Sequence, residues 1–274
     1  MAELVTERDI ALAIEKLGLS GKPVCIHSSL RSFGWVEGGA KAIIQGFLNQ
    51  GCTILVPTFS WRYAVPPPAD DRPARNGWDY KVYPGRTSGV DLIFTPASNE
   101  LDREDMGAIP EAVLSMPSRV RGNHPLCSFT ALGPLAERIV ADQRPLDVYA
   151  PFAALADEKG FVVLMGVGFD RMTLLHFAEK LAGRNLFRRW ANDLQGSPMA
   201  TEVGGCSDGF TKFEAVLSPF TQRLEVGGSL WRVLPARQAL DTATQAIRED
   251  PGITHCGDAQ CQRCNDGVQG GPIL

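Results

Sequence analysis

Apolar residues recur at helical spacing near the start of the chain. Thr6 followed by Asp9 has the capping-box pattern of a helix N-terminus. Apolar positions three and four residues apart then run from Ile10 to Leu17. This spacing predicts a helix over residues 7–17.

A strand–helix–strand unit follows this first helix. Residues 23–26 form a short apolar run, residues 40–49 have helical spacing, and residues 53–56 form a second apolar run. Such a unit predicts two parallel strands joined by a right-handed crossover. The first strand would place residues 27–31 at its carboxyl end.

The second half of the chain shows the same alternation. The strongly apolar run 161–165 predicts a central strand, and a glycine turn leads from it to Asp170, which can N-cap a helix over residues 171–181. Strands are expected within residues 200–235, and a helix over residues 237–249. The pattern predicts an α/β fold with a mixed, largely parallel central sheet and flanking helices.

Two segments lack this periodicity. Residues 58–105 contain three consecutive prolines and several aromatic residues, and residues 252–274 are rich in glycine and cysteine. A long irregular segment in a compact domain is usually functional or disordered, and the aromatic residues favour an ordered one. We therefore interpret residues 1–274 as a single domain with loops at 58–105 that line a ligand cleft and a Cys-rich C-terminal tail at 252–274.

Composition narrows the classes of partner. The chain has 274 residues and a formal net charge of −4, which is not the basic footprint of a nucleic-acid-binding protein. The N-terminal residues lack the apolar core of a secretory signal, and no apolar run is long enough to span a membrane. We expect a cytoplasmic protein without nucleic-acid or membrane partners, as a monomer or homodimer. Its seven cysteines should then be thiols or metal ligands.

One stretch after the predicted central strand carries candidate chemistry. Thr173, His176 and Glu179 are three residues apart and share one face of the predicted helix. Ligands of open α/β sheets bind at the carboxyl ends of strands, where this helix begins. A hydroxyl, an imidazole and a carboxylate there are suited to acid–base catalysis. The alternative is a histidine held by structural hydrogen bonds, with Glu179 as a solvated charge.

The tail has the spacing of a metal site. Cys261 and Cys264 form a C-x2-C pair, and Cys206 with either His255 or Cys256 would complete four nitrogen or sulfur ligands. This set predicts one structural zinc ion that anchors the tail and takes no part in catalysis. The alternative is a frayed terminus with free thiols.

Several short motifs in order give the chain a family resemblance. The sequence resembles the aminoglycoside 3-N-acetyltransferases, the antibiotic N-acetyltransferase family, which is distinct from the GNAT acetyltransferases. The matching stretches are residues 27–31, 56–60, 106–111, 119–125 and 166–179, together with the Cys-rich tail.

This resemblance implies an acetyl-CoA-dependent enzyme of antibiotic resistance. Its expected reaction is acetylation of the 3-amino group of a 2-deoxystreptamine aminoglycoside. His176 matches the family's catalytic histidine and would act as general base, since a neutral imidazole is available near pH 7. Glu111, which matches the family's Met-Gly-x-x-Pro-Glu motif, and Glu179 are the candidates to orient the imidazole. Thr173 is a candidate hydrogen-bond donor to the thioester oxyanion.

The same resemblance places the CoA site at the first strand end. His27, Ser28, Ser29 and Leu30 resemble the stretch that lines this site, and the serines, with free backbone amides, could hold phosphate or pantetheine. Arg31 and Arg119 are candidate partners for the CoA phosphates, because arginine binds phosphate through two hydrogen bonds. For His27 and His124 a structural role is favoured over a catalytic one.

Two other functions fit the same sequence. The first is an N-acyltransferase of the same fold that acts on a different metabolite amine. The second is a zinc-stabilised binding protein without turnover.

Overall fold

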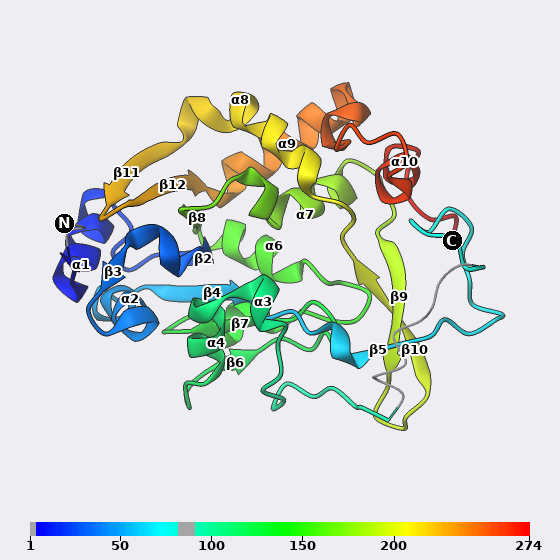
Figure 1. Ribbon diagram of the computed structural model, residues 1–274, viewed down its shortest axis with the longest axis horizontal. Coiled ribbons are helices and arrows are strands. Elements are labelled where there is room, and N and C mark those ends of the chain that lie inside the picture. The colour runs from blue at the N-terminus through cyan, green and yellow to red at the C-terminus, as the bar shows by residue number, and fades with distance from the viewer. Residues whose placement is uncertain (1–3, 82–90) are drawn as a thin grey trace.

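The fold has a central sheet with helices on both faces (Figure 1). The computed structural model describes residues 4–81 and 91–274, so residues 82–90 of the predicted cleft-lining loops lie outside the described part of the chain. The strands are β1 (Leu4–Val5), β2 (Pro23–Ser28), β3 (Trp35–Val36), β4 (Thr53–Pro57), β5 (Ala64–Val65), β6 (Val120–Arg121), β7 (Phe129–Leu132), β8 (Phe161–Met165), β9 (Phe187–Asn192), β10 (Pro198–Val203), β11 (Gln222–Val226) and β12 (Ser229–Pro235).

Helices account for most of the remaining regular structure. The α-helices are α1 (Glu7–Lys16), α2 (Gly39–Asn49), α3 (Arg103–Met106), α4 (Ala108–Leu114), α5 (Ala136–Val140), α6 (Ala150–Asp157), α7 (Leu174–Leu181), α8 (Phe213–Leu217), α9 (Ala236–Glu249) and α10 (Gln262–Val268). The 3-10 helices are η1 (Leu30–Phe33), η2 (Trp61–Tyr63), η4 (Phe169–Arg171), η5 (Asp208–Lys212), η6 (Ser218–Phe220) and η7 (Pro251–Thr254). None of the described helices has the length and apolar composition needed to cross a bilayer.

The central sheet is mixed and mostly antiparallel. Its seven described strands have the order β11-β12-β8-β2-β4-β7-β6. Only the pairs β2–β8 and β2–β4 are parallel, while β12 and β7 run antiparallel to their neighbours β8 and β4. The prediction of a mixed sheet is therefore right and that of a largely parallel one is wrong. The error arose because the strand–helix–strand unit gives only the parallel centre of the sheet.

Side-chain alternation divides the core into two halves. On β2, Val24 and Ile26 face one cluster, whereas Cys25 faces the other, as the period of two in a strand requires. Helices α1, α2 and α4 contribute Ile14, Phe47 and similar residues to the first half. Helices α5, α6, α7, α8 and α9 cover the opposite face. Both faces of β2 and β8 are consequently buried, which explains their nearly continuous apolar sequences.

The helix that carries the candidate catalytic residues begins later than predicted. Asp170 lies within the 3-10 helix η4, and α7 starts at Leu174 with Thr173 at the N-cap position. The side chain of Asp170 therefore does not N-cap this helix. The capping box at Thr6 and Asp9 is present as predicted, with α1 beginning at Glu7.

The tail packs against the irregular segment and the second sheet. Strands β10, β9 and β5 form this smaller sheet, so β5 ties residues 64–65 to the body. Ala74 forms a β-bridge with Ile273, and Arg75 Nε donates to the carbonyl of Gly271 at 2.6 Å. Figure 1 shows the C-terminus and α10 beside this region. The tail is thus ordered against the body, although it contributes few residues to the apolar core.

Candidate active site

A large cleft lies at the carboxyl ends of the parallel strands. It has a volume of about 980 Å³, and its lining includes residues 27–31 after β2, residues 103–106 of α3, and Thr173 and His176 after β8. Parallel strands bring the segments that follow them to one edge of a sheet, which explains why segments far apart in sequence meet there.

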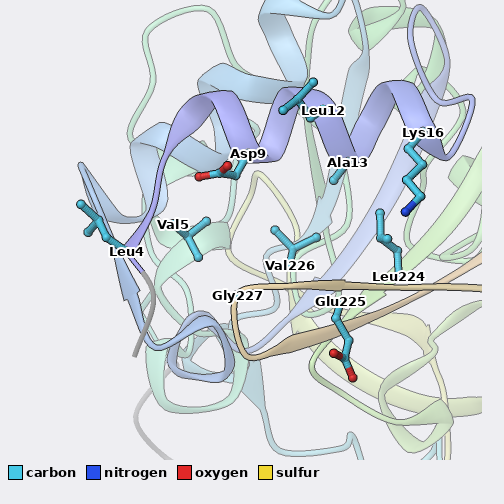
Figure 2. Close-up of a pocket in the computed structure, with 10 residues that line it drawn as sticks. All are labelled: Leu4, Val5, Asp9, Leu12, Ala13, Lys16, Leu224, Glu225, Val226 and Gly227. Atoms are coloured by element: carbon cyan, nitrogen blue, oxygen red, sulfur yellow. The ribbon is translucent and has the colours of Figure 1, made fainter. Parts of the chain in front are cut away.

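A smaller pocket elsewhere lacks such chemistry. It measures about 250 Å³ and lies between α1 and the hairpin of β11 and β12 (Figure 2). Figure 2 shows Leu224 and Val226 pointing toward α1 and Glu225 pointing away from it. Asp9, another lining residue, is occupied by its hydrogen bonds to Thr6 in the helix cap. We therefore place the candidate active site in the large cleft.

His176 and Glu179 form a buried hydrogen-bonded pair on α7. Nδ1 of His176 lies 2.8 Å from Oε2 of Glu179, and the two side chains are 10% and 11% exposed. A carboxylate only accepts hydrogen bonds, so the bonding pattern assigns the hydrogen of the neutral imidazole to Nδ1. Nε2 then has the lone pair that a general base requires. Glu179 is not the solvated charge of the alternative interpretation.

The second oxygen of Glu179 has its own partner. Nη1 of Arg184 donates to Oε1 of Glu179 at 2.6 Å and to Oγ1 of Thr254 at 2.7 Å. Nη2 of Arg184 donates to the carbonyl of Pro251 at 2.6 Å. This arginine is buried and was not among the predicted site residues. No local signal indicated it, because Thr254 is 70 residues away in sequence.

Three further groups fix the imidazole ring. Tyr149 stacks with the ring of His176 at a centroid distance of 6.1 Å, and the ring of Phe210 lies 4.7 Å from it. Gly204 packs so closely that a Cβ atom there would lie 2.6 Å from Cδ2 of His176. These residues were not predicted. The only sequence signal was the Gly204–Gly205 pair after a strand, which is typical of a close backbone approach.

The predicted CoA segment lines the cleft in full. Residues 27–31 all contribute to its wall. The backbone N–H of Ser29 donates to the carbonyl of Met165 at 2.9 Å, so this amide belongs to the sheet and is not free as expected. Burial lowers the pKa of His27 to about 4, and its Nε2 lies 3.7 Å from Sγ of Cys25. A neutral, buried His27 agrees with the structural role expected for it.

The side chains of Arg119 and Glu111 bind groups other than His176 and Glu179. The guanidinium of Arg119 donates to the carbonyls of Pro96, Ala97 and Ser98 and to Oδ1 of Asn99. The carboxylate of Glu111 pairs with Nε of Arg103 at 2.9 Å and is 42% exposed. Neither residue is among the described residues that line the cleft. Of the two carboxylates considered for orienting His176, the structure brings Glu179 to it.

His124 has a structural set of hydrogen bonds. Its Nδ1 accepts from the backbone N–H groups of Leu126 and Cys127, and its Nε2 donates to the carbonyl of Glu202 at 2.9 Å. Desolvation of the fully buried ring lowers its pKa to about 3. These bonds hold the turn before β7.

Four cysteines gather at the tail. The sulfur atoms of Cys206, Cys256, Cys261 and Cys264 all lie within 4.8 Å of one another, so they could hold a metal ion. His255 is not part of this cluster: its Nε2 is 3.0 Å from Oδ1 of Asn265, and its Nδ1 accepts from the N–H of Gly257. Of these two candidates, the structure therefore brings Cys256 to the cluster.

The chain is similar in sequence to known acetyltransferases. The SPbeta prophage-derived aminoglycoside N(3')-acetyltransferase-like protein YokD of Bacillus subtilis is 32% identical over 182 residues, which cover 64% of each chain. Aminoglycoside N(3)-acetyltransferase IX of Micromonospora chalcea is 34% identical over 186 residues, covering 65% of this chain and 63% of that protein. The matched region thus spans less than two thirds of these relatives.

The similarity extends to the whole fold. Aminoglycoside acetyltransferase AAC(3)-IVa, solved in complex with gentamicin, superposes with a TM-score of 0.76 at 25% identity, over 98% of this chain and 99% of that one. A sequence profile of the family described as aminoglycoside 3-N-acetyltransferase matches residues 25–248. This range contains the His176–Glu179 pair, the residues that line the cleft and nearly all of the central sheet. The chain therefore belongs to the aminoglycoside 3-N-acetyltransferase family.

Proposed function

We propose that this protein transfers the acetyl group of acetyl-CoA to the 3-amino group of a 2-deoxystreptamine aminoglycoside. The observation that carries the proposal is the buried His176–Glu179 pair at the wall of the large cleft. The family membership supports the reaction class. The gentamicin complex of AAC(3)-IVa supports the class of acceptor.

His176 is the proposed general base. The neutral amine attacks the thioester carbonyl carbon, its proton passes to Nε2 of His176, and the thiolate of CoA leaves. Glu179 holds Nδ1 and compensates the positive charge that develops on the ring. A base of this kind typically contributes about 10²- to 10⁴-fold to the rate.

The cleft walls suggest where each substrate lies. Residues 27–31 are the proposed binding segment for CoA, with Arg31 as its cation at the cleft. Glu104 and Asp105 on α3 are exposed acids in the same cleft, and they suit an acceptor that carries several ammonium groups. Thr173 lines the cleft at the start of α7, where its hydroxyl is the proposed donor to the thioester oxyanion.

The cysteine cluster has a structural role in this proposal. Four thiolates fill the tetrahedral coordination of zinc and leave no position for water or substrate. The donor set therefore fits a zinc ion that stabilises the tail. The reaction steps are assigned to protein side chains alone.

The test is acetyl-CoA turnover with arrayed acceptors. Purified protein is mixed with acetyl-CoA and gentamicin-, kanamycin- and apramycin-type compounds, and CoA release and product mass are measured. We expect CoA release and a gain of one acetyl group, placed on the 3-amino nitrogen by NMR of the product. Turnover only with other amines would favour the metabolite acyltransferase. No turnover with any amine, together with ligand binding, would favour a binding protein.

A further inference from the structure

We propose that Arg184 is a positioning residue through which the Cys-rich tail holds the His176–Glu179 pair in its working geometry. The assignment of His176 as base rests on the function proposed above. The contacts themselves do not depend on the identity of the acceptor.

Arg184 links two parts of the chain that are distant in sequence. One arm of its guanidinium, Nη1, donates both to Glu179 on α7 and to the hydroxyl of Thr254, at 2.6 and 2.7 Å. The other arm, Nη2, donates to the carbonyl of Pro251. The planar fork of an arginine fixes the directions of all three bonds together. The rotamer of Glu179 therefore depends on where η7 places its two acceptors.

The tail segment that holds Arg184 lies next to the cysteine cluster. Thr254 is the last residue of η7 and comes two positions before Cys256. The backbone of Thr254 and His255 also packs on Gly209, where a Cβ atom would collide with the carbonyl oxygen of Thr254. The cluster and this close packing together set the position of η7.

A second contact leads from the cluster to the same imidazole. Cys206, one of the four clustered cysteines, precedes η5, and Phe210 within η5 contacts the ring of His176. Gly204, two residues before Cys206, packs against Cδ2 of that ring. The segment 204–210 thus touches both the cluster and the proposed base.

Because Glu179 is buried, its bond to Arg184 matters for the orientation of its carboxylate. Arg184 is the cation that compensates the charge of Glu179 in this low-dielectric site. Without the guanidinium, Oε1 of Glu179 would be a buried charged oxygen without its partner. The carboxylate would then turn or recruit water, and its bond to Nδ1 of His176 would no longer be fixed in direction.

The primary test is NMR of the histidine rings in the substrate-free protein. The chain has only four histidines, so the Nδ1 and Nε2 resonances of each can be assigned with single substitutions. We compare the full chain with Arg184→Gln, Arg184→Lys and Thr254→Val. Thr254→Val keeps the shape of the side chain but removes the hydroxyl that binds Arg184. Lys212→Gln is the matched control, because Lys212 Nζ donates to the carbonyl of His255 but does not contact Glu179.

The expected results distinguish a role of Arg184 in positioning the His176–Glu179 pair from a general effect on the stability of the protein. Arg184→Gln and Thr254→Val should shift the Nδ1 proton of His176, whereas Lys212→Gln should leave it unchanged. In turnover assays, Arg184→Gln should lower kcat roughly ten-fold, the lower end of the effect of removing the partners that orient metal-bound histidines, with KM changed less than about two-fold. Arg184→Lys should restore part of kcat, because its ammonium can still bind Glu179.

Other outcomes overturn the proposal. An unshifted His176 resonance in both Arg184→Gln and Thr254→Val would show that the ring does not depend on this contact. Equal effects of Lys212→Gln and Thr254→Val would indicate general loosening of the tail. If Arg184→Gln fails to fold, Thr254→Val still decides the question. Resonance shifts in a protein that acetylates no aminoglycoside would contradict the proposed function but leave the positioning role intact.

Discussion

The four histidines show how environment gives one residue type different roles. His124 and His27 are buried, and desolvation lowers the pKa of each well below the ordinary value of a histidine. His255 is bound to Asn265 in the tail. Only His176 combines a carboxylate partner at Nδ1 with a place on the wall of the large cleft. This combination separates the proposed base from the structural histidines.

Substitutions at His176 and the two carboxylates test this assignment. His176→Ala should lower kcat at least about 100-fold, because Nε2 of His176 is the proposed acceptor of the amine proton. Glu179→Gln should lower kcat with little change in KM, since it removes the buried charge beside the imidazole. Glu111→Gln should stay near the normal rate, because its exposed pair with Arg103 contributes little. Steady-state kinetics measure all three. A Glu111→Gln defect larger than that of Glu179→Gln would contradict the roles assigned.

Burial of His124 should appear in the pH dependence of stability. The pKa of this histidine is about 3 in the folded protein and about 6.5 when unfolded. Between these values the unfolded chain binds a proton that the folded chain does not, so stability falls as the pH is lowered from 6.5. The largest slope from one such group is about 1.4 kcal/mol per pH unit.

The control for this pH effect is a variant that keeps a hydrogen-bond acceptor at position 124. In His124→Asn, the amide oxygen can accept from the backbone of Leu126 or Cys127 but does not titrate. Urea unfolding at pH 7.5 and pH 5 should give this variant a smaller pH slope than the unmodified protein, even if its stability at pH 7.5 is lower. His27 remains in both proteins, so the difference belongs to His124. Equal slopes would mean that His124 binds no additional proton on unfolding.

At the scale of elements, α1 is specified by its own sequence. The side chain of Asp9 accepts from the backbone N–H and the hydroxyl of Thr6, at 2.8 and 2.7 Å, and the N–H of Asp9 donates back to Thr6. These hydrogen bonds also lower the pKa of Asp9. The two bonds from the backbone N–H groups of Thr6 and Asp9 satisfy donors that a helix N-terminus would otherwise leave to water.

Removing this cap should cost stability without affecting chemistry. We expect Thr6→Ala to lower the free energy of unfolding by about 1 kcal/mol, the usual cost of losing an N-cap hydroxyl. Thr6→Ser keeps the hydroxyl and should lose much less. Chemical denaturation measures both variants, and acetyl transfer should be unchanged. A Thr6→Ser loss as large as that of Thr6→Ala would show that the hydroxyl is not the stabilising group.

The start of α7 was decided by packing. Asp170 had the right side chain and spacing for an N-cap, yet a 3-10 turn over residues 169–171 buries Phe169 in the core. This turn moves the start of the helix to Leu174 and leaves Thr173 at the cleft. The free energy gained by burying Phe169 outweighs the small difference between Asp170 and Thr173 in the free energy of capping a helix.

At the scale of the whole molecule, the tail contacts residues that hold the proposed active site. The sequence predicted a zinc site that stabilises the tail and takes no part in catalysis. In the structure, η7 binds Arg184 and the segment of Cys206 reaches the ring of His176 through Phe210. A change at the cluster should therefore reach the His176–Glu179 pair.

Metal removal tests this connection. Protein purified without added metal should contain about one zinc ion per chain by elemental analysis. A chelator should lower the Tm and shift the His176 ring resonances, because η7 loses its anchor beside Cys256. Cys261→Ser should do the same, whereas the buried thiol variant Cys52→Ala should retain the metal and the resonances. A metal-free protein with the same Tm and the same His176 signals would refute both the zinc site and its connection to the pair.

The sequence alone determined the features that depend on contacts between residues close together in the chain. The cap of α1, the buried strand β8 and the spacing that places His176 and Glu179 together depend on contacts within a few residues or on one stretch of apolar residues. The C-x2-C pair likewise predicted two of the clustered cysteines. Such local interactions are visible in the order of residues because the backbone brings these groups together in any fold that forms the element.

Contacts between distant segments were decided only by the tertiary structure. The antiparallel directions of β7 and β12, the choice of Glu179 over Glu111, and the bond from Arg184 to Thr254 all join parts of the chain that many alternative packings could separate. Arginines and threonines are common, and nothing near Arg184 in sequence marks its partner. The burial of both sheet faces and of the tail brings these groups together, and burial then requires each charge among them to be paired.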